Sequence, residues 1–205
     1  MHRASAFAET ELTALDRLAA RDSFITLVTT RADAPTVSHL PVLYSRVDGR
    51  IELRGHWARA NPQSRHDGAA LAIMHGPHAY ISPGWYPDKE VQARVPTWNY
   101  AVAHLHGRLT TFVDTDALAD LVTALSDHHE AAIGSDWKFE PQRADHRNQL
   151  RGITGFRFEV DRVEMTFKFN QNHPQANRLS VAERLEALGD ERNRDVAALM
   201  RERLD

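Results

Sequence analysis

Hydrophobic residues change their spacing soon after the start of the chain. Leu12, Leu15 and Leu18 recur every three residues and predict a helix over 9–21. Short segments rich in β-branched and apolar residues follow, and they predict strands over 23–30, 36–45 and 51–56. Asp48-Gly49 favours a hairpin turn between the last two strands. Three strands with such short connections indicate an antiparallel sheet or barrel rather than a doubly wound fold.

The strand pattern continues through the middle of the chain, and helices are predicted towards its end. Further strands are expected over 69–76, at the start of 79–89, over 95–113, and as a pair within 155–172 around a kink at Asp161-Arg162. Helices are expected after Asp114, over 141–151, from the capping box Ser180-x-x-Glu183, and after Gly189. We therefore expect a mainly β, antiparallel domain with flanking helices over 1–178 and a helical C-terminal extension of it over 179–205.

Composition narrows the functional classes. The chain has 25 Lys and Arg residues and 28 Asp and Glu residues, which give a formal net charge of −3. The charge therefore does not support non-specific electrostatic binding of nucleic acid. It has no cysteine, which rules out disulfides, thiolate metal sites and cysteine nucleophiles. No apolar run approaches the ~20 residues of a membrane span, and the start shows no signal-peptide pattern. We expect a cytoplasmic protein that does not enter a membrane.

The segment GHWARANP, residues 55–62, is the richest in candidate chemistry. It follows a predicted strand and brings His56, Arg59 and Asn61 to the start of a short helix or loop over 57–67. The N–H groups at a strand-to-helix junction suit a phosphate, and a guanidinium adds a charge-assisted hydrogen bond. The alternative interpretation is an ordinary helix cap with an exposed arginine.

A proline interrupts the second predicted strand. Ser38 and His39 precede Leu40 and Pro41, and proline is kept out of central strands because it lacks an N–H donor. Pro41 therefore indicates a sheet edge, a bulge, or a place where a planar ligand meets the strand backbone. An ordinary edge strand explains the same residues.

Aromatic and basic residues offer further candidates. The loop and strand around YISPGWY and VPTWNY concentrate tyrosines and tryptophans, which suit a core or an interface and also suit the wall of a flat ligand. Lys168, Gln171 and Asn172 stand where the last strand ends. Among 12 histidines no zinc-ligand spacing is present, so we expect no metal site. No glycine-rich nucleotide motif and no nucleophile elbow is present either.

In combination these segments resemble the PaiB-like proteins, a family of FMN-binding negative transcriptional regulators. The resemblance rests on SHLP (38–41), GHWARANPQ (55–63), GPHAYISPGWY (76–86), VPTWNY (95–100), GF (155–156) and KFNQN (168–172), in that order. It covers about residues 1–180. The chain departs from the family at Ser64, where the family tends to carry Trp, and at Phe169-Asn170, where Leu-Ser is more usual.

The resemblance implies an FMN-binding split β-barrel, usually a homodimer with FMN at the subunit interface. It implies that His56, Arg59 and Asn61 hold the phosphate and that Ser38, His39, Leu40 and Pro41 run along the flavin. Trp98, Asn99, Lys168 and Gln171 would close the site, from either subunit. A PaiB-like repressor is the expected function, although direct DNA binding has no support from the charge. An FMN-dependent oxidoreductase, with His39 and Tyr100 as candidate acid–base groups, and a haem-binding barrel are the alternatives.

Overall fold

The chain divides into two compact units in the computed structural model, which describes residues 5–31 and 33–204. The first, here called the sheet unit, comprises residues 16–31, 33–74 and 104–163. The second, the helix-pair unit, comprises residues 5–15, 75–103 and 164–204. Each unit is therefore assembled from stretches that are far apart in the sequence.

An antiparallel sheet of eight strands forms the framework, as the sequence pattern predicted. The strands are β1 (Ala8–Glu9), β2 (Phe24–Arg31), β3 (Ala34–Pro41), β4 (Leu43–Val47), β5 (Arg50–Ala58), β6 (Gly68–Ile81), β7 (Thr97–Phe112) and β8 (Ile153–Lys168). Their order is β3-β2-β6-β7-β8-β5-β4, and β1 pairs with β8. Strands β6, β7 and β8 each contribute residues to both units. The mainly β fold with flanking helices is confirmed.

The segment 36–45, expected as one strand, forms two strands with different partners. β3 ends at Pro41 and pairs with β2, whereas β4 begins at Leu43 and pairs with β5. Val42 between them is fully buried, and its N–H donates to the carbonyl oxygen of Ser23 at 3.0 Å. The expectation of one strand is wrong because Pro41 has no N–H with which to continue the ladder.

The turn between β4 and β5 has the predicted form. Asp48 has φ 51° and Gly49 has φ 78°, and a type I′ hairpin turn requires positive φ at both central residues. β5 then continues to Ala58, two residues beyond its predicted end, and pairs with β8 from Ile51 opposite Val160 onward.

The core of the sheet unit lies on one face of β2, β5 and β8. Leu27, Leu53 and Phe158 are fully buried there, and Trp57 packs on Phe156 with ring centroids 4.5 Å apart. Alternate residues of a strand point to opposite faces, so the even-numbered residues of β5 face away from this core. This division of β5 places the side chain of His56 on the face away from the core.

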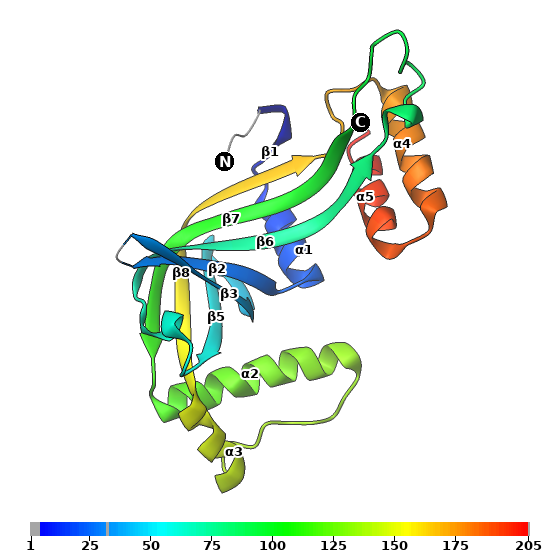
Figure 1. Ribbon diagram of the computed structural model, residues 1–205. Helices are drawn as coiled ribbons and strands as arrows, with labels where there is room; N and C mark the ends of the chain where they lie inside the picture. Colours follow the sequence, from blue (N-terminus) through cyan, green and yellow to red (C-terminus); the bar gives the residue numbers. More distant parts are fainter. Residues whose placement is uncertain (1–4, 32, 205) are drawn as a thin grey trace. The chain divides into compact units, whose positions relative to one another are not determined.

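Helices cover the other face of β5. The long α2 (Thr115–Ile133) begins at its predicted N-cap, Asp114, whose side chain accepts a hydrogen bond from the backbone N–H of Ala117. It packs on β5 and on the turn η4 (Leu150–Gly152), which follows the short α3 (Ala144–Gln149) (Figure 1). Leu118, Phe139 and Leu150 form the apolar cluster between these elements.

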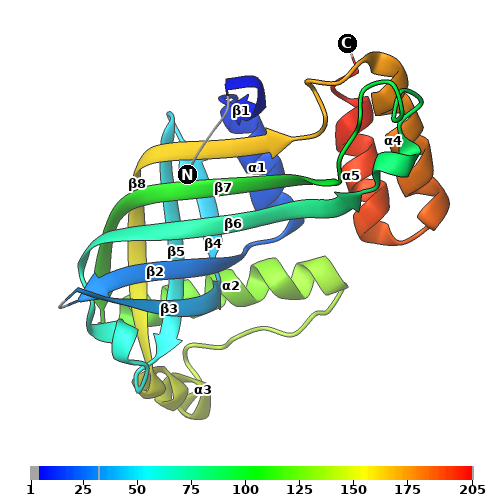
Figure 2. The same ribbon diagram turned by 45° about the horizontal axis from the view of Figure 1, so that its top comes forward.

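The helix-pair unit takes its name from α4 (Gln175–Leu188) and α5 (Glu191–Arg201). The two helices lie side by side, beside the short η3 (Pro83–Trp85) (Figure 2). The unit also holds η1 (Ser5–Phe7) and the start of α1 (Leu12–Arg21). Fully buried Val181, Leu185, Val196 and Met200 face each other in its core. No helix in the described part of the chain is long and apolar enough to cross a membrane.

Two expectations for the C-terminal third are wrong. Residues 155–172 do not form two strands, because β8 runs unbroken over 16 residues. Asp161 and Arg162, where the two strands were expected to meet, are exposed residues within this single strand. Ser180 does not cap a helix: α4 begins five residues earlier, after Pro174, and the Ser180 hydroxyl donates to the carbonyl oxygen of Trp85 at 2.7 Å.

Candidate functional site

A buried amide fixes the turn that follows β5. Gln63 lies in η2 (Pro62–Arg65) and is fully buried. Its Oε1 accepts from the indole N–H of Trp57 at 3.2 Å. Its Nε2 lies 3.0 Å from both Thr29 Oγ1 and the carbonyl oxygen of Thr36, and 3.1 Å from the carbonyl oxygen of Leu27. One side chain thereby ties the GHWARANP segment to β2 and β3.

This anchoring places Asn61 against Ser38. Asn61 is the N-cap of η2, its Oδ1 accepting from the N–H of Gln63 at 2.9 Å and its Nδ2 donating to Ser38 Oγ at 3.0 Å. Ser38 is nearly buried, with 8% of its surface exposed. Its hydroxyl accepts from Asn61 and retains its own proton as a donor.

The backbone of the same turn differs from what we expected of an anion site. The N–H groups of Arg59, Asn61, Gln63, Ser64 and His66 already donate within the protein. The helix is only four residues of 3-10 helix, too short for an appreciable dipole. Because these five N–H groups are occupied, a phosphate here would depend largely on side chains.

Two arginines stand at the ends of this turn. Arg59 is held by its backbone N–H, which donates to the Gly152 carbonyl at 2.8 Å, and by its Nη2, 3.3 Å from the Ile153 carbonyl oxygen. Arg65 is the last residue of η2. Both side chains are exposed, and none of the ion pairs in the described ranges 5–31 and 33–204 involves either of them. Two exposed arginines at the ends of the turn that carries Asn61 form a donor set that fits a phosphate.

The four candidates on β3 divide between the two faces of the sheet. Ser38 stands opposite Leu27 and Leu40 opposite Ile25, both core residues of β2, so Ser38 and Leu40 point inward. His39 and Pro41 point outward and are exposed. His39 Nδ1 lies 3.1 Å from Thr26 Oγ1 on the same outer face. A flat ligand on one face can meet only alternate side chains of this segment.

β3 lies at an edge of the sheet. It stands at the end of the strand order and pairs only with β2 among the strands described. Of the three alternatives for Pro41, the strand order supports a sheet edge. One side of the β3 backbone therefore has no strand partner among those described, which suits hydrogen bonding to a ligand.

His56 lies away from the other phosphate candidates. It stands opposite Gly155 on the face of β5 that α2 covers, whereas Ser38 and Trp57 face the core. Burial lowers the pKa of His56, so the ring is neutral at pH 7. Its Nδ1 is buried and makes no hydrogen bond of normal geometry within the described residues.

Trp98 and Asn99, neighbours on β7, point in opposite directions. Trp98 is 52% exposed, and its ring centroid lies 6.0 Å from those of His78 and Tyr80. Asn99 is fully buried, and its Nδ2 donates to Met200 Sδ at 3.3 Å. Only Trp98 of this pair is placed to stack on a ligand at the surface of the helix-pair unit.

Lys168 and Gln171 stand at the end of β8. Lys168 Nζ donates to Thr97 Oγ1 at 2.5 Å, and burial lowers the pKa of this lysine. Gln171 closes the strand end, because its Oε1 accepts from the Phe169 N–H at 2.7 Å and its Nε2 donates to the Phe167 carbonyl at 2.5 Å. The amide of Gln171 is thus occupied within the protein, whereas Lys168 borders a cavity described below.

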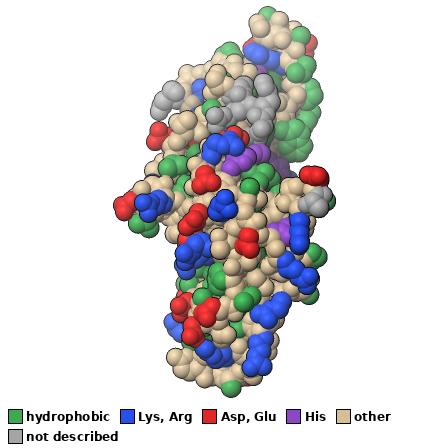
Figure 3. Space-filling model, turned by 90° about the vertical axis from the view of Figure 1, so that its left-hand side faces the viewer, with side chains coloured by type: hydrophobic (Ala, Val, Ile, Leu, Met, Phe, Trp, Pro, Cys, Tyr) green, Lys and Arg blue, Asp and Glu red, His purple; other side chains and the backbone are tan. Residues whose placement is uncertain are grey.

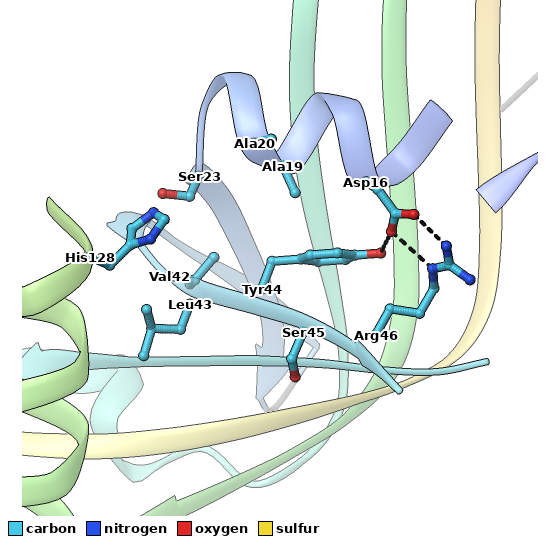
Figure 4. A pocket seen from close by; sticks show the side chains of 10 residues that line it. All are labelled: Asp16, Ala19, Ala20, Ser23, Val42, Leu43, Tyr44, Ser45, Arg46 and His128. Atoms are coloured by element: carbon cyan, nitrogen blue, oxygen red, sulfur yellow. Dashed lines mark hydrogen bonds and ion pairs between the residues drawn. The ribbon is translucent and has the colours of Figure 1, made fainter. Parts of the chain in front are cut away.

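A pocket of about 360 Å³ lies between α1 and β4 in the sheet unit (Figure 4). Tyr44 Oη donates to Asp16 Oδ1 at 2.7 Å, and Arg46 donates to both carboxylate oxygens of Asp16. These hydrogen bonds lower the pKa of Asp16, while burial raises the pKa of Tyr44. The two charged side chains of this pocket are already paired with each other, so it offers a ligand no free charge.

Sequence reasoning missed Gln63 and the pair Thr29–His66, whose Oγ1 and Nδ1 lie 2.6 Å apart in the buried network. Gln63 is part of GHWARANPQ, yet no pattern marks a glutamine as buried. No group of three or more His, Asp or Glu within 5–31 and 33–204 has the arrangement of a metal site.

Comparison with known proteins decides the family. A family model described as "Putative FMN-binding domain" matches residues 1–162, most of the chain. The chain belongs to this FMN-binding family. Its relative "Protease synthase and sporulation protein PAI 2" from Bacillus subtilis is 32% identical over 189 residues, covering 89% of this chain and 88% of that protein. An uncharacterised protein of Emericella nidulans is 26% identical, covering 99% and 97%.

Solved structures support the fold of this FMN-binding family member. An FAD and haem binding protein from Mycobacterium smegmatis has a TM-score of 0.57 at 18% identity, over 78% of this chain and 73% of that one. The flavocytochrome Anf3 from Azotobacter vinelandii has a TM-score of 0.57 at 12% identity, over 82% and 72%. The chain therefore has the split-barrel fold that the sequence led us to expect.

Proposed function

We propose that this chain binds FMN and that the turn after β5 holds the phosphate of the cofactor. The arrangement that carries the proposal is the Gln63 anchor, which places Asn61 on Ser38 at 3.0 Å in a turn flanked in sequence by two exposed arginines. A phosphate monoester carries about −1.5 to −2 charges at pH 7, and Arg59 and Arg65 supply two positive charges. Arg59 also has its backbone held by the Gly152 carbonyl, which fixes the base of its side chain.

The edge of β3 is the second part of the proposed cofactor site. The isoalloxazine ring would lie along β3, with backbone groups of residues 38–41 as hydrogen-bond partners. His39 and Pro41 are the exposed side chains there, while Ser38 points towards the phosphate turn. Bound FMN would supply hydride and electron transfer, and the chain would supply position and hydrogen bonds. His56 has no part in the proposed contacts, because it faces α2.

A second copy of the chain is the proposed partner. Phe24 and Val37 are 53% and 52% exposed on the outer face of β2 and β3, beside His39. Such large apolar side chains are typical of an interface. In a homodimer with FMN at this interface, the exposed Trp98 of a second copy would cover the flavin. Light scattering during gel filtration tests this proposal: a dimer supports it, and a monomer with FMN fully bound contradicts it.

We propose a regulatory role exerted through the flavin, in line with the resemblance to repressors. Direct DNA reading has weaker support, because both signs of charge occur along the face shown in Figure 3 and the net charge is −3. A gel-shift assay distinguishes the two routes. Retardation that persists at physiological salt supports direct binding, whereas retardation only at very low salt argues against it.

The absorption spectrum of the purified protein tests the choice of cofactor. Flavin bands support the proposal, and a Soret band would show haem instead. Protein isolated without either is reconstituted with FMN and with haem in parallel. Anaerobic addition of NADH or NADPH to the flavin form then tests the oxidoreductase alternative: reduction supports it, and no reduction with either nucleotide argues against it.

A further inference from the structure

A second cavity, in the helix-pair unit, has no part in the proposed phosphate turn. It has a volume of about 400 Å³ and lies between the loop 92–97 and the end of β8. Its lining includes Phe7, Thr97, Lys168, Asn170, Asn172 and His173. All of these residues belong to the helix-pair unit.

One positive charge in this cavity lacks a counterion. Arg94 in the lining is neutralised by Asp88, which accepts from its Nε at 2.9 Å and from Nη2 at 2.5 Å. Lys168 donates only to the Thr97 hydroxyl, and no carboxylate within 5–31 and 33–204 lies at ion-pair distance from its Nζ. Burial lowers the pKa of His173, so its ring adds no charge at pH 7. The cavity therefore has one unbalanced positive charge.

Two residues that line this cavity have buried polar atoms without partners among the described residues. Asn170 is 1% exposed, and its Nδ2 donates to Tyr86 Oη at 2.6 Å while its Oδ1 has no partner among the described residues. The ring of His173 stacks on Tyr86 with ring centroids 4.8 Å apart, and its buried Nδ1 also has no partner among the described residues. A buried acceptor without a donor destabilises the protein, so a ligand that donates a hydrogen bond to it binds more tightly.

We propose that this cavity binds a small carboxylic acid that carries an O–H or N–H donor next to its carboxylate. Lys168 pairs with the carboxylate, Asn170 Oδ1 accepts from the neighbouring donor, and Phe7 contacts the apolar part of the ligand. A single positive charge matches a monoanion better than a phosphate dianion. The site goes beyond the proposed FMN function, whose contacts lie on the phosphate turn and β3, and it gives Lys168 a role other than the cofactor contact that the family resemblance implies.

The test is isothermal titration calorimetry with mandelate, which has a carboxylate, an adjacent hydroxyl and a phenyl ring. Phenylacetate lacks the hydroxyl and mandelamide lacks the charge. We expect mandelate to bind at least about tenfold more tightly than either, the effect of one charged or buried hydrogen bond. No detectable binding of mandelate, or equal binding of all three compounds, overturns the proposal.

Substitutions of the lining residues test whether mandelate binds in this cavity. Lys168→Met and Asn170→Gly should each weaken mandelate binding about tenfold, and glycine tolerates the φ of 61° at position 170. Lys138→Met, which removes a lysine that is 72% exposed, is the matched control and should leave the affinity unchanged. Thermal unfolding midpoints show that each variant is folded, and Lys168→Arg replaces Lys168→Met if the latter is not. Arginine should then retain most of the affinity.

Competition between mandelate and FMN tests whether this cavity is separate from the cofactor site. We expect mandelate to bind equally to the FMN-loaded and FMN-free protein. If FMN displaces mandelate, the cavity belongs to the cofactor site and the proposal of a separate site is overturned. If mandelate binds while FMN does not bind at all, the proposed function fails and this site stands.

Discussion

The indole N–H of Trp57 donates to the side-chain oxygen of Gln63 across the turn that follows β5. Both side chains are essentially fully buried, at 1% and 0% exposed. The amide nitrogen of Gln63 also reaches the backbone of β2 and β3. A single polar side chain in the core therefore decides where the proposed phosphate turn lies relative to those strands.

Removing this amide should destabilise the fold. Gln63→Ala leaves the Trp57 indole and two backbone carbonyls without their partner, and we expect a loss of roughly 3 kcal/mol in the free energy of unfolding. Urea denaturation measures it. Gln142→Ala, at an exposed loop position, is the control and should change stability by less than about 0.5 kcal/mol. A Gln63→Ala protein as stable as the control would contradict the role of the network.

Because β7 and β8 approach closely, replacing one of two glycines by alanine should destabilise the protein far more than replacing the other. A Cβ on Gly107 would lie 2.0 Å from the carbonyl oxygen of Glu159, whereas a Cβ on Gly152 would meet no atom within 4 Å. Gly107→Ala should therefore cost roughly 3 kcal/mol or more, because the neighbouring backbone must move. Gly152→Ala should be close to neutral. Equal unfolding midpoints for the two variants would disprove the close approach.

Acid should weaken the helix-pair unit through Asp88. Hydrogen bonds from Arg94 lower the pKa of this carboxyl from 3.8 to about 2. A carboxyl whose folded pKa is depressed stabilises the fold above its unfolded pKa, and this stabilisation is lost as the pH falls towards the folded pKa. The difference in unfolding midpoint between wild type and Asp88→Asn should thus be largest above pH 3.8 and shrink towards pH 2.

Thermal unfolding over that pH range checks the sign. Asp136→Asn, at an exposed position, is the matched substitution. The unfolding midpoint of Asp136→Asn should differ little from that of wild type at every pH in this range. A difference for Asp88→Asn that grows on acidification would show that the ion pair does not act as described.

Local signals predicted the elements that depend on local chemistry. Asp48-Gly49 gave the hairpin because both residues tolerate positive φ, and Asp114 gave the start of α2 because its side chain caps the first turn. The capping pattern at Ser180 gave a wrong helix start, because the same residues can also lie within a helix. There the Ser180 hydroxyl donates to the carbonyl oxygen of Trp85. The capping pattern does not show where a longer helix starts.

Features that depend on tertiary pairing escaped prediction. The pattern over 36–45 is continuous in hydrophobicity, and only the pairing of β3 with β2 and β4 with β5 separates the halves. The sequence proposes the candidate residues but does not show which way their side chains point: Asn99 turns towards Met200, and His56 lies under α2. Burial of Gln63 and the cavity beside Lys168 depend on contacts between distant segments, which no local pattern contains.

The central claim, FMN held through its phosphate by the turn after β5, is tested most directly by titrating apoprotein with FMN and following the quenching of flavin fluorescence. Wild type and Arg59→Ala are compared, with Arg192→Ala, an exposed arginine on α5, as control. We expect Arg59→Ala to weaken FMN binding by about 1.5–3 kcal/mol, roughly 10- to 150-fold, and to leave riboflavin, which lacks the phosphate, bound as weakly as before. Equal FMN affinity for wild type and Arg59→Ala would contradict the account.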